Sequence, residues 1–286
     1  MAVIATGFFD GVHLGHRQVI DTLVSVARQR SERSVVVTFW PHPRTVFQSD
    51  ARTLRLLTSL DEKKRLLADM GVDEVEVLAF DAAFSPISTR RYLEEVVKGR
   101  LGGSAIVLGY DNRMGHDLLS PEEIAVEASS LGLDVLRCGP CEFSGAAVSS
   151  TRIRQAIADG SILEANSMLG YGYGIHGVVV AGKQLGRRLG FPTANMQLYE
   201  PLKMLPQRGV YLTRVETLGG EYYGMTNVGD IVETNIFDFN EDIYGRDITL
   251  TFLRRLRDVR TFDSLDALTE QLSKDRETCR ELMRFI

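Results

Sequence analysis

Two histidines spaced three residues apart form the sharpest chemical feature of this sequence. His13 and His16 lie in the segment G-F-F-D-G-V-H-L-G-H, which follows a short apolar run and opens a helical pattern. Glycines let a backbone approach a ligand closely, and a helix N-terminus offers free N–H groups to an anion. Two imidazoles placed there can donate hydrogen bonds to phosphate oxygens as charge moves onto a leaving pyrophosphate. The alternatives are a tight turn with surface histidines and a zinc site, although no third ligand lies nearby in the sequence.

A second candidate is the segment Ser149–Arg154, which reads S-S-T-R-I-R and opens another predicted helix. Its hydroxyls can cap that helix, and Arg152 and Arg154 can reach the β- and γ-phosphates of a nucleotide. Capped helices with two arginines are common, so this segment is a weak signal by itself. Together with the histidine pair at the other end of the same α/β region, it becomes a strong one.

Two further motifs resemble known functional motifs but do not match them fully. The C-G-P-C string at 138–141 matches thioredoxin-like redox sites, in which the first cysteine caps a helix. Residues 142–148 read instead as loop or strand, so Cys138 and Cys141 receive no assigned role. The segment Gly177–Lys183 nearly matches a phosphate-binding P-loop, but Gln184 stands where the Ser or Thr that binds Mg²⁺ belongs.

The elements that must position these residues alternate between strand and helix as far as about residue 170. The predicted strands are 3–8, 34–39, 74–79, 105–108 and 134–136, and the predicted helices are 16–28, 59–71, 90–97 and 121–131. Ser59 and Glu62 have the spacing of a capping box at the start of one helix. This order predicts a Rossmann-like parallel sheet with helices on both faces, whose ligands sit at the carboxyl ends of the strands.

Beyond residue 170 the pattern changes to frequent glycines and short strands. The predicted strands are 175–181, 210–215, 221–227, 232–237 and 247–252. Regular short strands favour a small antiparallel β-barrel, and apolar spacing over 264–286 predicts a closing helix. We therefore place a boundary near Gly170–Gly174 and expect two domains, 1–169 and 170–286.

Composition limits the classes of partner. The 286 residues carry 33 Lys and Arg against 38 Asp and Glu, a net charge of −5. A mildly acidic chain is a poor candidate for sequence-independent nucleic-acid binding, which draws on clustered positive charge. No stretch approaches ~18 consecutive apolar residues, so no membrane helix is expected. Three cysteines suit a reducing cytoplasm. We expect a cytoplasmic protein with small-molecule partners, no nucleic-acid or membrane partner, and a transient homo-oligomer as an open option.

These motifs together resemble a known family. The histidine motif plus S-S-T-R-I-R resembles the nucleotidyltransferase superfamily. With P-H-P at 41–43 and G-Y-D-N-R-M-G at 109–115, the first half resembles the adenylyltransferase module of bacterial bifunctional riboflavin kinase/FAD synthetase. G-R-R-L-G-F-P-T-A-N at 186–195 is similar to the signature of that family's kinase barrel, with G-V-Y at 209–211 and D-I-Y-G at 242–245 behind it. The resemblance covers nearly the whole chain, in family order.

The resemblance implies an α/β nucleotidyltransferase domain followed by a riboflavin kinase barrel. The second module would transfer the γ-phosphate of ATP to riboflavin, giving FMN. The first would transfer AMP from a second ATP to FMN, giving FAD and pyrophosphate. Riboflavin, FMN, FAD and ATP are thus the expected substrates and products, and Mg²⁺ is the expected cofactor.

The same resemblance implies roles for individual residues. The expected catalytic residues are His13, His16, Arg154 and Glu233, with Glu233 as the general base of the kinase. The expected ATP-binding residues are Gly7, Phe8, Asp10, Gly15, Ser150, Thr151, Gly182 and Lys183. The expected flavin-binding residues are Asp111 and Asn112, and the expected Mg²⁺ ligands are Thr193 and Asn195.

Two rivals remain beside this interpretation. Only Asp230 and Ile231 separate N-V-G at 227–229 from V-E at 232–233, where the family usually has a longer loop of the G-T-x-P-T type, and this bears on the flavin pocket of the kinase. The stretch after Asp117 is also short. The first rival is therefore a single-activity FAD synthetase with an impaired kinase half. The second is a non-catalytic flavin-binding regulator, which would not need the retained histidines and Glu233.

Overall fold

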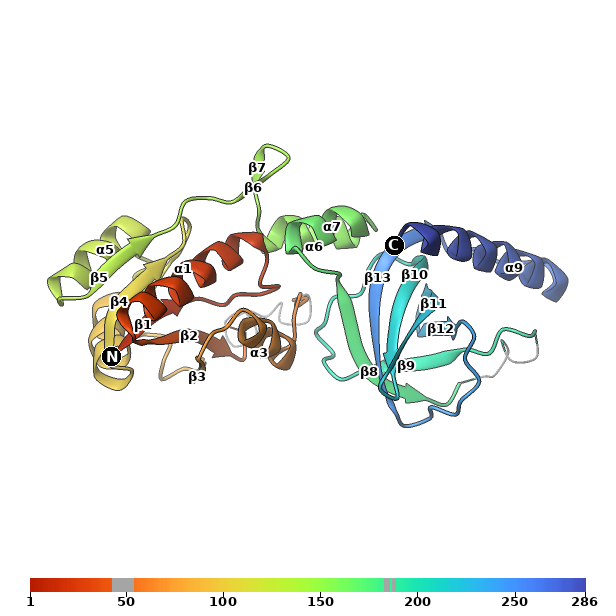
Figure 1. Ribbon diagram of the computed structural model, residues 1–286, viewed down its shortest axis with the longest axis horizontal. Helices are drawn as coiled ribbons and strands as arrows, with labels where there is room; N and C mark the ends of the chain where they lie inside the picture. Colours follow the sequence, from red (N-terminus) through yellow and green to blue (C-terminus); the bar gives the residue numbers. More distant parts are fainter. Residues whose placement is uncertain (43–53, 183–185, 187–188) are drawn as a thin grey trace. The chain divides into compact units, whose positions relative to one another are not determined.

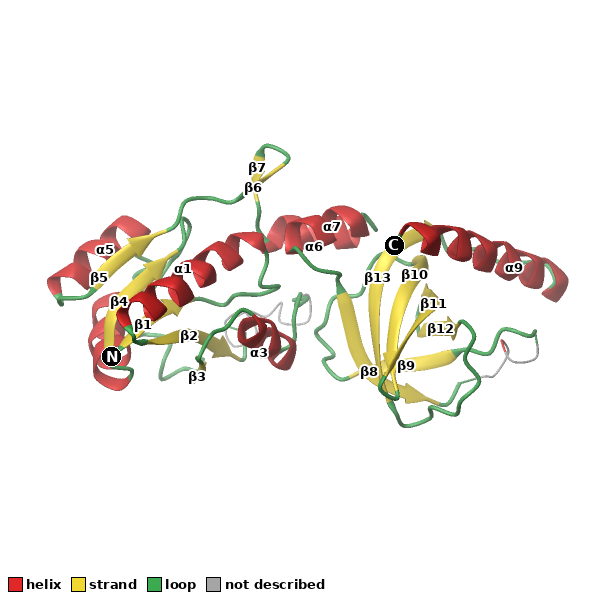
Figure 2. Ribbon diagram, in the orientation of Figure 1, coloured by secondary structure: helices red, strands yellow, loops and turns green. Residues whose placement is uncertain are grey.

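The computed structural model describes residues 1–42, 54–182, 186 and 189–286. Contacts between residues divide the chain into two compact units, Met1–Ser150 and Thr151–Ile286. The first unit mixes helices and strands, and the second holds a barrel of strands with helices beside it (Figures 1 and 2). The predicted combination of an α/β domain and a β-barrel is confirmed.

The first unit is built on a parallel five-stranded sheet with the order β3-β2-β1-β4-β5. Its strands are β1 (Ala2–Thr6), β2 (Arg33–Trp40), β3 (Glu74–Ala79), β4 (Gly103–Leu108) and β5 (Asp134–Arg137). Each one overlaps a predicted strand. Val35, Val36 and Val37 of β2 are all fully buried, as expected where both faces of a parallel sheet are covered.

Helices cover both faces of this sheet. Val3 and Ala5 of β1 contact an apolar cluster that includes Leu23, whereas Ile4 belongs to a second cluster with Leu93. Alternation along the strand therefore sends successive side chains to opposite layers. The helices are α1 (Leu14–Arg30), α3 (Leu60–Asp69), α4 (Thr89–Tyr92), the π-helix η1 (Leu93–Arg100) and α5 (Pro121–Ser130). The short strands β6 (Glu142–Phe143) and β7 (Ala146–Ala147) pair as a hairpin after the cysteine motif.

Local sequence signals explain where two helices begin. Ser59 and Glu62 form the predicted capping box before α3, each side chain bonding the backbone N–H of the other. The helix α1 begins at Leu14, two residues earlier than predicted, because the side chain of His13 takes the N-cap position. A histidine is an unusual N-cap, and its use here ties the helix to the chemistry described below.

The second unit contains a closed antiparallel barrel with the order β10-β11-β12-β9-β8-β13. Its strands are β8 (Gly174–Val180), β9 (Ala194–Leu198), β10 (Gly209–Thr217), β11 (Gly220–Val228), β12 (Val232–Ile236) and β13 (Asp247–Arg257). The strand patterns did not predict β9, whose A-N-M-Q-L sequence lacks β-branched residues. Pairing with β8 and β12 on its two sides makes it a strand and closes the barrel.

Two helices precede the barrel and belong to the same unit. They are α6 (Ser150–Ala158) and α7 (Ile162–Leu169). Asn166 donates through Nδ2 to the Phe252 carbonyl at 3.0 Å and accepts the Tyr173 N–H at 2.7 Å. The Gln207 N–H donates to the Ile157 carbonyl at 3.1 Å. The division by contacts therefore falls before these helices, whereas the sequence places the boundary after them, and the domain limits stay a prediction.

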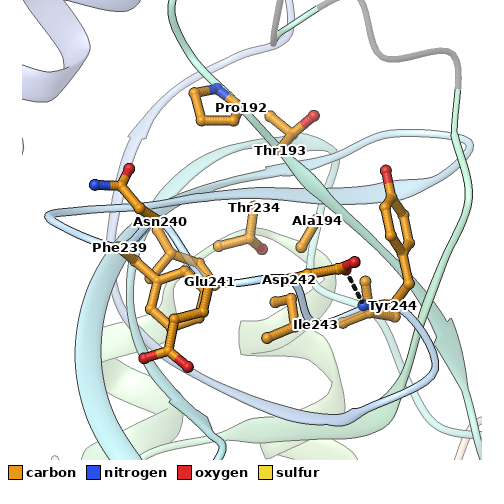
Figure 3. Close-up of a pocket in the computed structure, with 12 residues that line it drawn as sticks. Pro192, Thr193, Ala194, Thr234, Phe239, Asn240, Glu241, Asp242, Ile243 and Tyr244 are labelled. Carbon is orange, nitrogen blue, oxygen red and sulfur yellow. Dashed lines mark hydrogen bonds between the residues drawn. The ribbon is translucent and has the colours of Figure 1, made fainter.

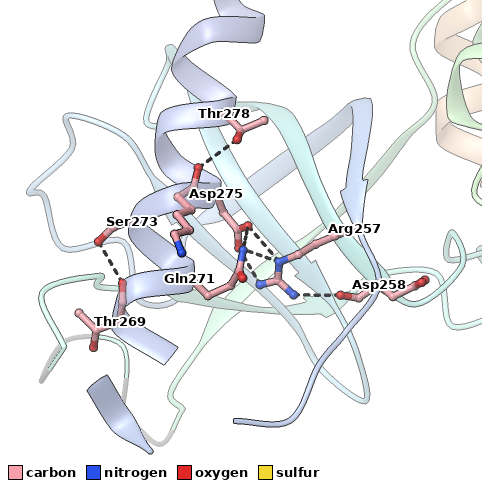
Figure 4. Close-up of polar contacts among 8 residues, drawn as sticks. Arg257, Asp258, Thr269, Gln271, Ser273, Asp275 and Thr278 are labelled. Carbon is pink, nitrogen blue, oxygen red and sulfur yellow. Dashed lines mark hydrogen bonds and ion pairs between the residues drawn. The ribbon is translucent and has the colours of Figure 1, made fainter. Parts of the chain in front are cut away.

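The helix α9 (Leu265–Leu282) confirms the predicted C-terminal helix and is followed by a short 3-10 turn. Leu272 and Cys279 contact the apolar face of the barrel. Arg257, the last residue of β13, donates through Nε and one terminal nitrogen to the Asp275 carboxylate at 2.6–2.9 Å (Figure 4). Their side chains are only 13% and 5% exposed, so a buried ion pair joins the helix to the barrel.

Candidate active sites

The histidine motif follows β1, the strand at which the order of the parallel sheet reverses. β1 pairs with β2 on one side and with β4 on the other. In open parallel sheets, ligands bind outside the carboxyl ends of the strands at such a switch point. The loops after β1 and β4 meet at this end, because Asn112 donates through Nδ2 to the carbonyl of Thr6 at 3.3 Å. The structure therefore brings the predicted histidine and flavin loops together.

The two histidines lie ring against ring at the start of α1. Nδ1 of His13 accepts the backbone N–H of His16 at 3.3 Å, so a neutral His13 carries its proton on Nε2. The two rings are stacked, with 3.6 Å between centroids and 16° between planes. Burial, followed by the charges of His13 and Lys63, holds the pKa of His16 well below its usual value. His16 is therefore neutral at pH 7, and within the described residues its buried Nδ1 has no hydrogen-bond partner.

Close packing explains two of the predicted glycines. A Cβ on Gly15 would lie 3.3 Å from the ring of His13, and a Cβ on Gly7 would lie 3.3 Å from the ring of Phe9. Larger residues would push these rings out of place. The same loop holds Phe9 and Val12 at φ values of +50° and +36°. Left-handed backbone at non-glycine residues costs ~1–3 kcal/mol and gathers at functional loops, so this strain accords with a binding site.

Asp10 braces the loop against the segment before α3. Its carboxylate accepts the backbone N–H groups of Leu57 and Thr58, each at 3.0 Å, and the Thr58 hydroxyl at 3.1 Å. Its carbonyl oxygen accepts the hydroxyl of Ser150 at 3.0 Å. The carboxylate predicted to contact ATP thus bonds the protein's own backbone in this structure, and its contact with ATP stays a prediction.

The other predicted residues of the first site are divided between the two units. Asp111 is exposed in the loop after β4, beside the half-buried Asn112. Thr151 and Arg154 lie on α6, which the contacts assign to the second unit. Ser150, the first residue of that helix, is the one that bonds the histidine loop. The approach of Thr151 and Arg154 to a nucleotide stays a prediction.

Two cavities formed by described residues of the barrel unit have Thr193 as a common lining residue. The first, of about 440 Å³, lies between β8, β9, β12 and the loop 239–244, where Asp242 accepts the N–H of Tyr244 at 3.1 Å (Figure 3). The second, of about 420 Å³, is lined mainly by apolar side chains of the barrel, of α9 and of the segment between them. Thr193 lines both cavities. Adjoining cavities of this kind suit a reaction between two substrates.

Glu233 lies between two amides on the wall of the second cavity. In the register of the barrel it is opposite Asn195 of β9 and Asn227 of β11, and directly opposed residues share a face. Glu233 and Asn235 line the second cavity and Thr234 lines the first, as strand alternation predicts. The carboxylate predicted as a general base therefore faces the apolar cavity.

Asn195 is opposite this carboxylate in the barrel register, and Thr193 lines the same cavity. Asn195 is buried, and its Oδ1 has no hydrogen-bond partner in the part of the chain that the structure describes. An unpaired buried carbonyl oxygen is costly, and it is also the hard type of ligand that Mg²⁺ takes. Gly182 lies directly against this amide, since a Cβ there would come within 1.8 Å of Nδ2 of Asn195. Lys183, predicted to bind ATP, lies outside the described residues.

Sequence reasoning missed several polar residues near these sites. Asn235 shares one face of β12 with Glu233, and Asn227 lies opposite Glu233 on β11, so polar residues that alternate with apolar ones were a usable signal for a polar site. Lys63 is fully buried although it is a lysine. Helical spacing could have predicted this burial, because Lys63 occupies the apolar face of α3 between Leu60 and Leu67.

Comparison with known proteins assigns both halves of the chain. The family described as FAD synthetase matches residues 1–152, and the family described as riboflavin kinase matches residues 169–283. A bifunctional riboflavin kinase/FMN adenylyltransferase from Bacillus subtilis is 32% identical, covering 96% of this chain and 90% of its own length. The chain belongs to the bifunctional riboflavin kinase/FMN adenylyltransferase family. The resemblance drawn from the motifs is confirmed.

Two further relatives agree with this assignment. The bifunctional riboflavin kinase/FMN adenylyltransferase of Escherichia coli K12 is 34% identical, over 98% of this chain and 92% of its own length. A crystal structure described as a macrolide-efflux protein from Streptococcus pneumoniae is also 34% identical, with a TM-score of 0.91 over 98% of this chain and 93% of that one. In this member of the bifunctional family, no described helix has the length and apolarity to cross a membrane.

Proposed function

We propose that this chain phosphorylates riboflavin to FMN in its barrel unit and adenylylates FMN to FAD in its α/β unit. The observation that carries the proposal is that each unit keeps its reactive side chains where its fold binds ligands. His13 and His16 lie at the switch point of the sheet. Glu233 faces a cavity that adjoins a second one at Thr193. A flavin-binding regulator would need neither arrangement.

In the kinase step, the apolar second cavity suits the flavin ring, and the first cavity is left for ATP. The shared residue Thr193 then lies where the two substrates meet. The terminal ribityl hydroxyl attacks the γ-phosphorus, the bond to the β-phosphate oxygen breaks, and ADP leaves. Glu233 accepts the hydroxyl proton as the new bond forms, a contribution of ~10²–10⁴-fold for a positioned base.

We infer that Thr193 and Asn195 hold the Mg²⁺ ion of this step. The unpaired, buried Oδ1 of Asn195 and the Thr193 hydroxyl are hard oxygen donors; Asn195 is opposite Glu233 in the barrel register, and Thr193 lines the same cavity as Glu233. The ion, when bound, neutralises phosphate charge. The absence of a side chain at Gly182 leaves room for the Asn195 amide, since a Cβ there would clash with it.

In the adenylyl step, a phosphate oxygen of FMN attacks the α-phosphorus of ATP and pyrophosphate leaves. His13, through Nε2, and His16 stabilise the charge that develops, together with the N–H groups at the start of α1. Gly7, Phe8 and Gly15 form the loop around the phosphates. In the same proposal Ser150, Thr151 and Arg154 hold the triphosphate, and Asp111 and Asn112 contact the flavin.

The proposal also covers location and partners. We place the protein in the cytoplasm, with small molecules as its partners and no nucleic-acid partner. The net charge of −5 and the free state of Cys138, Cys141 and Cys279 support this placement. A transient homo-oligomer stays a prediction.

The test is incubation of the whole chain with riboflavin, ATP and Mg²⁺, followed by chromatography of the flavins. Formation of FMN and then FAD supports the proposal. FMN without FAD would show that the adenylyltransferase is inactive. If added FMN becomes FAD while riboflavin stays unchanged, the chain is a single-activity FAD synthetase. No conversion of either flavin would favour the non-catalytic regulator.

A further inference from the structure

Lys63 is a buried cation behind the histidine loop, and neither proposed reaction uses it. Its side chain is 0% exposed, at the first turn of α3. Among the described residues it has no ion-pair partner within 4 Å. Burial lowers the pKa of Lys63 to about 8, against the opposing effect of the Asp10 charge. The Asp10 charge offsets this burial only in part, and an incompletely compensated buried charge weakens a fold, so its presence calls for another explanation.

The contacts of Lys63 converge on one loop residue, Phe8. Its Nζ lies 3.8 Å from the centroid of the Phe8 ring, a cation–π contact. The same Nζ donates to Oγ1 of Thr38 at 3.3 Å, and the Thr38 hydroxyl donates to the carbonyl of Phe8 at 3.2 Å. His42 lies against the Phe8 ring edge-on, with 3.9 Å between centroids. Both the ring and the carbonyl of Phe8 are thus held from α3 and β2.

The segment that carries Lys63 also holds the other end of the loop. Leu57 and Thr58, just before α3, donate to the carboxylate of Asp10. The charge of Lys63 is close enough to His16 to contribute to the lowered pKa of that imidazole. A positive field from α3 therefore reaches the place where the histidine loop receives phosphates.

We propose, resting on the adenylyl transfer proposed above, that Lys63 is a positioning residue for that reaction, which fixes Phe8 in the histidine loop and supplies a fixed positive field behind the triphosphate. In a buried, low-dielectric site a charge acts over a longer range than in water, and it needs no reorganisation when the substrate binds. The negative charge of ATP then compensates the cation. The lysine is thus unfavourable in the free protein and favourable in the complex.

The charged groups around Lys63 determine how it titrates. Asp10 faces it from the histidine loop, and His16 faces it from α1 with His13 stacked on it. On α3 itself, its sequence neighbour Glu62 is half-buried and accepts the backbone N–H of Ser59. Its other neighbour, Lys64, is exposed. His42 lies on the Phe8 ring. Raising the pH through about 8 removes the proton from Lys63, so its field is present below that pH and absent above it.

The experiment compares Lys63→Met with the exposed control Lys64→Met in the whole chain. We expect kcat/KM for ATP in FAD formation to fall at least ~10-fold in Lys63→Met and to stay unchanged in the control. The rate of FMN formation in the same preparation should equal that of the wild type. The thermal midpoint at pH 7 should stay the same or rise, because a buried charge that Asp10 offsets only in part has gone. A lower midpoint together with equal loss of both activities would overturn the proposal, as would unchanged FAD formation.

The pH profile supplies a second, independent measurement. Wild-type FAD formation should decline as the pH rises through about 8, and Lys63→Met should lack this decline. Thr38→Val removes the hydrogen-bond acceptor of the ammonium group, so the decline should move to lower pH. If Lys63→Met does not fold, a Thr38→Val profile identical to that of the wild type would by itself overturn the proposal.

Discussion

The two proposed active sites of this chain are assembled in opposite ways. The histidine pair at the centre of the first comes from one short stretch, the loop after β1 and the start of α1. The second is drawn across strands, where Glu233 of β12 meets Asn195 of β9 and Asn227 of β11 only through the barrel register. A contiguous site depends on local backbone geometry, whereas a dispersed site depends on the strand pairing of the whole barrel.

This difference suggests where each site can be damaged. In the first unit, the hydrogen bonds of Asp10 hold the loop although the backbone at Phe9 and Val12 is strained. In the second unit, a change away from Glu233 can act through the packing of the barrel, for example at the ion pair between α9 and Arg257, which itself lines the second cavity. Substitutions can therefore separate the two activities, and they can also separate chemistry from folding.

The largest expected effect is the loss of the kinase base. Glu233→Gln keeps the shape of the side chain and removes its ability to accept a proton, so FMN formation should fall ~10²–10⁴-fold. FAD formation from supplied FMN should not change. The control is Glu221→Gln, an exposed carboxylate on the neighbouring strand. Wild-type kinase rates in Glu233→Gln would remove this residue from the mechanism and leave Asp230, Asp238 or Asp242 as candidates.

The corresponding experiment on the first site removes one of its histidines. His16→Ala should slow adenylyl transfer ~10²–10³-fold, the usual effect of losing one preorganised donor to a developing oxyanion. The kinase rate should be that of the wild type, and Gln18→Ala on the exposed side of α1 should affect neither reaction. Steady-state rates with FMN and with riboflavin measure both. Equal loss of the two activities would point instead to a folding defect.

A smaller effect is expected from the buried ion pair of the barrel. Asp275→Asn leaves the Arg257 guanidinium buried without its counter-charge, so the free energy of unfolding of the barrel unit should fall by about 3 kcal/mol. Glu277→Gln, on the exposed side of α9, is the matched control. The measurement is urea unfolding, monitored through both enzymatic activities. In Asp275→Asn the kinase activity should be lost at a lower urea concentration than in the wild type, while FAD formation from FMN persists.

The smallest effect concerns the boundary between the units. Fragments 151–286 and 170–286 should both make FMN, but the shorter one lacks the two Asn166 hydrogen bonds to the barrel. At ~0.5–1.5 kcal/mol per bond, it should be less stable by about 1–3 kcal/mol in chemical denaturation. Fragment 1–169 should convert FMN to FAD. Equal stability of the two barrel fragments would favour the boundary near Gly170.

Sequence alone determined what depends on neighbours along the chain. The histidine motif, the capping box at Ser59 and the alternation of strand and helix are local, and the sequence therefore predicted the parallel sheet, the barrel with its final helix and the family. Alternation along β12 also separated Glu233 from Thr234 correctly. In each case the physical cause is the fixed periodicity of helices and strands, which is readable without knowing any partner.

Only the tertiary structure decided what depends on distant partners. Pairing with β8 and β12 made a strand of Ala194–Leu198, which has weak strand propensity of its own. Register placed Asn195 and Asn227 beside Glu233. The burial of Lys63 beneath Phe8 follows from how α3 packs against the loop after β1. These are contacts across long loops of chain, whose free energy depends on the complete fold and leaves only weak traces in local composition.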